Sequence, residues 1–266
     1  MTSQIVPKPV IEYTCLEKFA KYQIVALDAS DVTEKGRAKR VFRLHYAIDL
    51  LKMCGVAYKI TAQKTGETLK NFRINKKWLV LADRVYGTLS GIEHCLVSEA
   101  NFALRIKYKA FKLYDEAGKE IDILKKISAA CGNAFEMAAF VELPTFGLTK
   151  LRVCVCKIPD NKLEQVAKRN KRRDSKKQIS TSAQALKMSE YVVIVTSLPK
   201  DILLEDIISL YRYRWQVEIY FKRFKSILDF GNIPLYREDS IYTWLNGKLL
   251  ISLLIEQMLS EVSFSP

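Results

Sequence analysis

The chain has 266 residues, 49% of them hydrophobic, which is enough for one large core with an insertion or for two modest domains. The apolar stretch near its C-terminus, Leu249–Ile255, is interrupted by Ser252 and is far shorter than the ~20 residues of a membrane-spanning helix. The stretch Thr2–Pro9 is polar and contains proline, unlike a signal peptide. We therefore expect a cytoplasmic protein that does not act in a membrane.

Positive charge is in large excess, with 43 Lys and Arg against 29 Asp and Glu and a formal net charge of +14. Such an excess attracts polyanions, so nucleic acid is the leading partner. Residues 168–177 (KRNKRRDSKK) hold seven of the cations. One interpretation of this run is a solvated loop; the other is a mobile basic loop that a phosphate backbone orders, with Lys171, Arg172 and Arg173 as contacts.

The six cysteines, at positions 15, 54, 95, 131, 154 and 156, show no CxxC spacing. Cys154 and Cys156 alternate within an apolar run that is typical of a strand, so we expect reduced, buried thiols. Only His45 and His94 offer an imidazole, which argues against a zinc site made of cysteine and histidine.

Strands and helices are predicted to alternate in the first part of the chain. Residues 23–28 (QIVALD) form a mostly apolar segment that ends in Asp28, and residues 78–82 (WLVLA) are followed directly by Asp83. Further strands are predicted at 41–48, 56–61 and 102–106, and a helix over 89–100. This pattern indicates a mixed α/β sheet with covering helices, in which acids at strand ends point into a shared crevice.

Between residues 107 and 199 the sequence changes to short strand-like segments, turns and polar stretches, and we predict this region to be a β-rich insertion. It contains a turn-like segment at 115–120 (DEAGKE), strand-like segments at 151–156 and 191–196, and the basic run. The predicted organisation is therefore an α/β domain that starts in residues 1–106, is interrupted by 107–199, and is completed by 200–266.

Residues 201–228 lack Gly and Pro and have the apolar periodicity of one long helix. At about 100° per residue, Tyr211, Arg214, Glu218 and Lys225 fall at about 0°, −60°, −20° and −40°, on one narrow face. A face with one phenol, two cations and one acid suits phosphate contacts around a metal ligand. The alternative is an ordinary intrahelical salt bridge between Arg214 and Glu218, which are four residues apart.

These four residues fit the pattern Y-x2-R-x3-E-x6-K, which resembles the YREK motif of the insertion-sequence-four (IS-four) family of DDE transposases. The segment VALDASD at 25–31, with RLHYAIDL at 43–50, resembles the first-Asp region of that family. VLADRVYG at 80–87 resembles the second, and ALRIKY at 103–108 the strand that follows. The resemblance covers roughly residues 22–258.

The resemblance implies a ribonuclease H-like fold with a β-rich insertion, and a bacterial, nucleoid-associated enzyme. It implies cut-and-paste transposition at insertion-sequence ends, through a hairpin, on double-stranded DNA that includes transposon ends and target, with a homodimer on the DNA. Metal-dependent phosphodiester cleavage and strand transfer would use two Mg²⁺ or Mn²⁺ ions. The implied metal ligands are Asp28, Asp83 and Glu218, and the implied phosphate contacts are Tyr211, Arg214 and Lys225.

Some assignments have alternatives within the sequence. Asp31 lies three residues after Asp28, but Asp28 directly ends the apolar strand and fits the family's D-x-[ST] pattern, so Asp31 is expected to cap or to face solvent. Asp49 and His45 are interpreted as structural residues of the sheet, and Asp83 as a loop acid paired with Arg84 is the alternative to a ligand.

The aromatic side chain that would hold an extruded base is not identified by the sequence. Trp215 is expected to point toward the core, Phe111 and Phe146 have no better support, and Trp78 is expected to pack in a buried strand. A C-terminal amphipathic helix over 240–262 is predicted to pack on the core or to contact a second copy.

The sequence departs from the family at its N-terminal side. Family members usually carry a helical region that recognises transposon ends before the first Asp, and only 27 residues precede Asp28 here, so a chain without its end-binding region is one expectation. Two other functions remain open: a ribonuclease H-like nuclease without strand transfer, and a non-catalytic DNA-binding remnant of a transposase.

Overall fold

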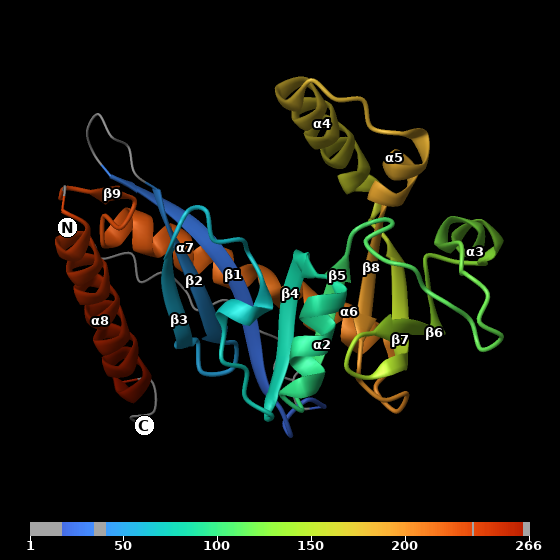
Figure 1. Ribbon diagram of the computed structural model, residues 1–266, viewed down its shortest axis with the longest axis horizontal. Coiled ribbons are helices and arrows are strands. Elements are labelled where there is room, and N and C mark those ends of the chain that lie inside the picture. The colour runs from blue at the N-terminus through green and yellow to red at the C-terminus, as the bar shows by residue number, and fades with distance from the viewer. Residues whose placement is uncertain (1–17, 35–40, 236, 263–266) are drawn as a thin grey trace.

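A computed structural model describes residues 18–34, 41–235 and 237–262 of the chain (Figure 1). Within these residues nine strands form one sheet in the order β3-β2-β1-β4-β5-β8-β7-β6, and β9 pairs with β1. The strands are β1 (Gln23–Glu34), β2 (Val41–Asp49), β3 (Cys54–Ala62), β4 (Trp78–Gly87), β5 (Asn101–Ile106), β6 (Ala134–Leu143), β7 (Gly147–Lys157), β8 (Tyr191–Thr196) and β9 (Asn232–Ile233). Cys15 and Thr2–Pro9 lie outside the described residues.

Helices cover both faces of this sheet. The described helices are η1 (Leu69–Asn71), α2 (Leu89–Val97), α3 (Ile123–Ala129), α4 (Asp160–Lys177), α5 (Ala183–Ser189), α6 (Leu204–Arg212), η2 (Tyr213–Trp215), α7 (Gln216–Ile227) and α8 (Glu238–Val262). Helices α6, α7 and α8 share one apolar core with one face of the strands, and η1, α2 and α3 share a second core with the other face. The structure thereby confirms the predicted mixed α/β sheet with covering helices.

Side-chain alternation assigns each strand residue to one of the two cores, because successive residues of a strand point to opposite faces. Ala26 of β1 and Leu81 of β4 belong to the core under α6–α8, which we call the α7 face. Leu27 and Ala82 belong to the opposite core. Any residue two positions after Ala26 or Leu81 therefore points to the α7 face.

Strand β1 is longer than predicted, because it continues to Glu34 instead of ending at Asp28. Its antiparallel pairing with β2 runs on to Thr33↔Val41, which provides backbone partners for the polar residues beyond Asp28. The parallel pairing of β1 with β4, in contrast, stops at Leu27↔Ala82. The predicted strand end is therefore wrong for the strand itself but correct for its pairing with β4.

Segment 107–199 contributes β6, β7 and β8, and these strands continue the same sheet through antiparallel pairing of β8 with β5. The predicted turn at 115–120 is present, with Gly118 at φ 77°. The expectation of a loop for the basic run 168–177 is wrong, because these residues form the C-terminal half of α4. Lys, Arg, Gln and Glu are good helix formers, and basic residues in the last turn interact favourably with the helix dipole.

The single helix predicted over 201–228 is divided in the structure into α6, the 3₁₀ turn η2 and α7. A 3₁₀ residue turns about 120° instead of about 100°, so three such residues add about 60° of rotation. This extra rotation explains why the predicted inward position of Trp215 is wrong: its side chain is 48% exposed.

The predicted C-terminal helix is confirmed as α8, which packs Ile241, Leu245 and Leu249 against the sheet core. None of the helices in the described residues combines the length and the apolarity that crossing a lipid bilayer requires. The five described cysteines are free thiols; the expected burial is confirmed for Cys95 and Cys154 but is wrong for Cys131, which is exposed, and Cys54 and Cys156 are half-buried.

Candidate active site

Asp28 and Asp83 occupy equivalent positions on two neighbouring parallel strands. The last β1–β4 register pair is Leu27↔Ala82, and the two acids are the next residue on each strand. Each acid lies two positions after a residue of the α7 face, Ala26 or Leu81, so both carboxylates point toward α6 and α7. Two carboxylates are thereby placed side by side where the pairing of their strands ends.

The Asp28 carboxylate is held in a partly buried position, with its side chain 20% exposed. Its Oδ1 accepts a hydrogen bond from the backbone N–H of Ala29 at 2.8 Å. Burial raises the pKa of Asp28 to about 6, and the negative charges of Asp83 and Glu218 contribute in the same direction. A carboxylate with this environment needs a nearby positive charge to stay ionised.

The Asp83 carboxylate is oriented by its own backbone, because its Oδ1 accepts a hydrogen bond from the N–H of Val85 at 2.7 Å. None of the ion pairs within the described residues joins Asp83 to Arg84, which removes the main support for the alternative of a salt-bridged loop acid. Nearby, a Cβ on Gly87 would lie 2.0 Å from the carbonyl oxygen of Arg105. A glycine at position 87 therefore lets β4 approach β5 closely beside the acid.

Arg214 connects the acid of β1 to the acid of α7. Its Nη2 donates to Oε1 of Glu218 at 2.7 Å, and its Nη1 lies 3.9 Å from Oδ2 of Asp28. The Arg214 side chain is 15% exposed, whereas that of Glu218 is 51% exposed. The intrahelical salt bridge considered from the sequence therefore exists, and the same guanidinium also faces Asp28.

Tyr211 and Arg105 complete the polar cluster on the α7 face. The Tyr211 hydroxyl donates to the carbonyl oxygen of Ala82 at 3.2 Å, and burial raises the pKa of Tyr211 to about 12. Arg105 follows Ala103 of the same core by two residues, and burial lowers the pKa of its guanidinium. The charges of Tyr211, Arg84, Asp83 and Arg214 act on it as well.

Arg105 was missed by the sequence reasoning, which used residues 103–108 only as a matching strand. The available signal was the position of a cation two residues after an apolar residue of that strand, on the face that the neighbouring acids share. A lone Arg in a strand is more often a surface residue, so this signal depends on knowing the register of β5 with β4.

The other predicted phosphate contacts lie apart from this cluster. Lys225 is exposed in the last turn of α7, two turns or about 10 Å beyond Glu218. Lys171, Arg172 and Arg173 belong to α4, which is separate from the helices that cover the sheet (Figure 1). The structure thus brings together Asp28, Asp83, Tyr211, Arg214 and Glu218, and leaves the four lysines and arginines outside that group.

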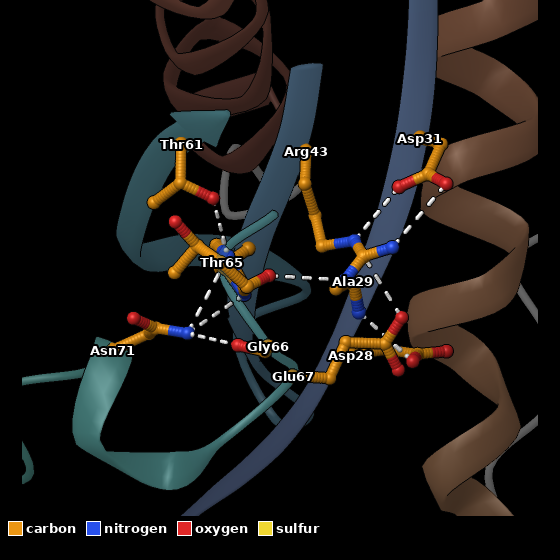
Figure 2. A network of polar contacts seen from close by, with 10 residues as sticks. Asp28, Ala29, Asp31, Arg43, Thr61, Thr65, Gly66, Glu67 and Asn71 are labelled. Carbon is orange, nitrogen blue, oxygen red and sulfur yellow. Dashed lines mark hydrogen bonds and ion pairs between the residues drawn. The ribbon is translucent and has the colours of Figure 1, made fainter. Parts of the chain in front are cut away.

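Asp31 lies three positions after Asp28 on β1, so strand alternation directs it to the opposite face, and its partners are drawn in Figure 2. Arg43 of β2 donates to Asp31 through Nε at 2.7 Å and through Nη2 at 3.3 Å, and its Nε lies 3.6 Å from Glu67. The third bond of Arg43 goes to the carbonyl oxygen of Thr65 at 3.1 Å. Arg43 therefore fastens the 65–67 segment to the sheet, and Asp31 is engaged as its ion-pair partner, which supports Asp28 as the first acid.

His45 and Asp49 are structural, as expected. His45 is fully buried and its Nε2 lies 3.0 Å from the Thr61 hydroxyl oxygen, while burial lowers its pKa to about 4. Asp49 accepts hydrogen bonds from the backbone N–H groups of Leu51 and Lys52 at 2.9 and 3.0 Å. Both side chains therefore have protein partners and are not needed as metal ligands.

The carboxylates of Asp28, Asp83 and Glu218 are suitable ligands for a hard divalent cation, although they are not gathered closely enough in this structure to form a metal-binding group. In the described part of the chain no three His, Cys, Asp or Glu side chains are gathered as metal ligands. The buried Tyr86 hydroxyl, however, has no hydrogen-bond partner in the structure. Tyr86 belongs to the core opposite the α7 face, and burial, followed by the negative charges of Asp28, Glu67 and Asp83, raises the pKa of its hydroxyl. Carboxylate oxygens are what Mg²⁺ and Mn²⁺ prefer, so the chemistry of Asp28, Asp83 and Glu218 fits such an ion.

Comparison with known proteins agrees with this geometry. Over 254 residues the chain is 22% identical to the transposase for insertion sequence element IS421 of Escherichia coli, covering 90% of this chain and 67% of that relative. It is 26% identical over 100 residues to the transposase for insertion sequence element IS231C of Bacillus thuringiensis subsp. berliner, covering 37% and 21% of the two chains. The Transposase DDE domain family matches residues 19–254. With the match spanning the whole described sheet and both acid-bearing strands, the chain belongs to the transposase DDE domain family.

Proposed function

We propose that this chain is the catalytic region of an IS-four family transposase, which cleaves DNA at insertion-sequence ends and joins the freed ends to target DNA. The observation that carries the proposal is the placement of Asp28 and Asp83 side by side on the face covered by Tyr211, Arg214 and Glu218. The last three residues also have the YREK spacing. In this proposal residues 1–106 and 200–266 form the catalytic domain and 107–199 its insertion.

The proposed ligands of two Mg²⁺ or Mn²⁺ ions are Asp28, Asp83 and Glu218. Bound divalent ions would supply a water or a 3′-hydroxyl that is nucleophilic at neutral pH, and would stabilise the leaving oxygen. The protein contributes the orientation of the ligands: Ala29 and Val85 donate backbone hydrogen bonds that aim the carboxylates of Asp28 and Asp83. Each of these acids uses one oxygen in its backbone bond.

Arg214 is the residue that changes partner in this proposal. Without substrate, its guanidinium neutralises Asp28 and Glu218. When the carboxylates bind cations, the positive charge between them is no longer needed, and the guanidinium is free to donate to a DNA phosphate. Arg105 and Tyr211 border the same place, so the two guanidinium groups, and the Tyr211 hydroxyl once it leaves the Ala82 carbonyl oxygen, would be the donors to the cleaved phosphate.

The proposed partners are double-stranded transposon ends and target DNA, bound by two copies of the chain. A hairpin intermediate and a nucleoid location are part of this proposal, as the IS-four resemblance implies. Lys225 is proposed to contact a phosphate about two helical turns from Glu218. Base stacking has a candidate in Trp215, because its ring is exposed at the start of α7, directly after Arg214.

The test is a joining assay with Mn²⁺, supercoiled plasmid, and a labelled short duplex with free 3′-hydroxyl ends, comparing the chain with its Glu218→Ala variant. A transposase transfers the label to the plasmid, and the variant does not. Nicked plasmid without transferred label would support the nuclease instead. A DNA mobility shift without nicking in either protein would support the non-catalytic remnant, with which the separated carboxylates are compatible.

A further inference from the structure

Helix α4 is exposed along its whole length. None of its 18 residues is buried; it packs against α5, and Asp160 at its start pairs with Lys157 of β7 at 2.8 Å. In Figure 1 the two helices lie together beyond the ends of β7 and β8, clear of the helices that cover the sheet. We call α4, α5 and their connection the arm. Because α4 has no buried residue and the arm adds only Met188 of α5 to a core, packing does not explain the sequence of α4.

The arm is connected to the sheet at the end of β7 and the start of β8, which is the end of the strands where Asp28 and Asp83 lie. Through the registers of β4, β5 and β8, Leu27 of β1 and Val153 of β7 are at one level of the sheet. Asp28 is one residue beyond that level, and β7 continues in the same direction to Lys157, about 10 Å further. Helix α4 begins at Asp160. Four strand spacings, about 19 Å, separate β1 from β7.

Four cations of α4 form one stripe. Relative to Lys162, the residues Arg169, Arg172 and Lys176 lie at about −20°, −80° and −40° around the helix. The stripe is about 21 Å long, which corresponds to about six base-pair steps of duplex. All four side chains belong to exposed residues, and none of the ion pairs within the described part of the chain involves them.

Two of the other cations of α4, Lys168 and Arg173, are engaged within the arm. Lys168 pairs with Glu164 at 2.6 Å. Arg173 donates to Asp174 and, at 2.6 Å, to the Thr181 hydroxyl, and Asp174 accepts from the same hydroxyl at 2.8 Å. These bonds fasten the end of α4 to the chain that leads into α5. The clasp fixes the rotation of α4 and keeps the stripe away from α5.

We propose that the stripe of Lys162, Arg169, Arg172 and Lys176 binds the phosphate backbone of the DNA duplex beside the cleavage site, an inference that rests on the proposed function. Cations three and four residues apart on a helix repel one another, and phosphates relieve this repulsion. The contacts are with the backbone and carry no sequence preference. Of the three residues of the basic run expected from the sequence to bind DNA, the stripe includes Arg172. Lys171 points away from the stripe, and Arg173 is hydrogen-bonded within the arm.

The test compares two double variants that each remove two positive charges from α4. Arg169→Ala/Arg172→Ala changes the stripe, and the control Lys171→Ala/Lys177→Ala changes positions at about 180° and 60°, outside it. The binding constant for a duplex is measured between 50 and 200 mM salt, and its logarithm is plotted against the logarithm of the salt concentration. Each lost phosphate contact lowers the magnitude of the slope of this plot by about 0.9. We expect a slope reduced by about 1.8 in the stripe variant and the wild-type slope in the control.

Equal slope changes in both variants, or no change in the stripe variant, would overturn the proposal. Alanine favours helix, so α4 should persist in these variants, and circular dichroism is used to check its helix content. As a second control, Arg169→Gln/Arg172→Gln must reproduce the change in slope. Catalysis is scored separately: a stripe-dependent slope in a chain that never cleaves DNA overturns the proposed function and leaves the stripe intact. DNA cleavage by a chain whose stripe variant and control variant have the same salt slope would overturn the proposal for the stripe and leave the proposed function standing.

Discussion

We predict that the ionised Asp28 carboxylate destabilises the metal-free protein at neutral pH, and that Asp28→Asn therefore stabilises it. The folded-state pKa of Asp28 is about 6, against 3.8 for the free side chain. The difference of about 2.2 pKa units corresponds to about 3 kcal/mol at 1.36 kcal/mol per unit. The carboxylate is only 20% exposed, so little of this is lost to solvent screening.

The sign follows from the direction of the shift. Because the folded state binds the Asp28 proton more tightly than the unfolded state, stability is highest below pH 3.8 and falls as the pH rises toward 6. The penalty is about 1 kcal/mol at pH 4.5 and about 3 kcal/mol at pH 7.5. An asparagine at position 28 keeps the acceptor for the Ala29 amide and carries no charge, so its advantage should follow the same curve.

The assay is thermal unfolding of both proteins in a chelating buffer at pH 4.5 and 7.5. At about 2 to 4 °C per kcal/mol, the Tm of Asp28→Asn should exceed that of the wild type by about 6 to 12 °C at pH 7.5, and by much less at pH 4.5. Added Mn²⁺ should raise the Tm of the wild type only. A variant that melts with or below the wild type at pH 7.5, or a gain that is independent of pH, would refute the reasoning.

Three further predictions concern the residues that support the site. Arg152→Ala should lower the free energy of unfolding by about 3 to 5 kcal/mol, because the buried guanidinium binds Glu136 and the carbonyl oxygens of Pro199 and Ile202 just before α6; urea unfolding checks this, with exposed Lys150→Ala near zero as control. Gly87→Ala should cost more than about 2 kcal/mol and disturb Arg105, since its Cβ would lie 2.0 Å from the Arg105 carbonyl, whereas Gly66→Ala meets nothing within 4 Å and should be close to neutral in the same assay. Tyr211→Phe removes the hydrogen bond to Ala82 and should lower stability by about 1 kcal/mol while slowing DNA cleavage, and an unchanged rate would contradict a role at the site.

The strands of the acid-bearing half were predictable from the sequence, because apolar runs bounded by polar residues identify buried strands. That Asp28 and Asp83 would meet also followed from the pattern, since each comes directly after such a run. What the pattern did not contain was the register of the predicted strand β2, whose backbone pairing extends β1 past Asp28.

The departures have a common cause in tertiary context. One uniform helical rotation was assumed through Trp215, and a 3₁₀ turn of three residues was enough to expose that side chain. The charge density of α4 suggested a loop, although its composition favours helix. Arg105 could be assigned to the site only once the register of β5 placed it beside Asp83.

The central claim is that Asp28, Asp83 and Glu218 act together in metal-dependent DNA cleavage. The most direct test is the rate of Mn²⁺-dependent nicking of supercoiled DNA by the wild type and by Asp28→Asn, Asp83→Asn and Glu218→Gln, with Asp31→Asn as the matched control on β1. We predict that each of the first three variants loses nicking by at least about 100-fold at unchanged DNA affinity, and that Asp31→Asn keeps most of the activity. Nicking that survives in any of the three acid variants, or that is lost equally in the control, would contradict the account.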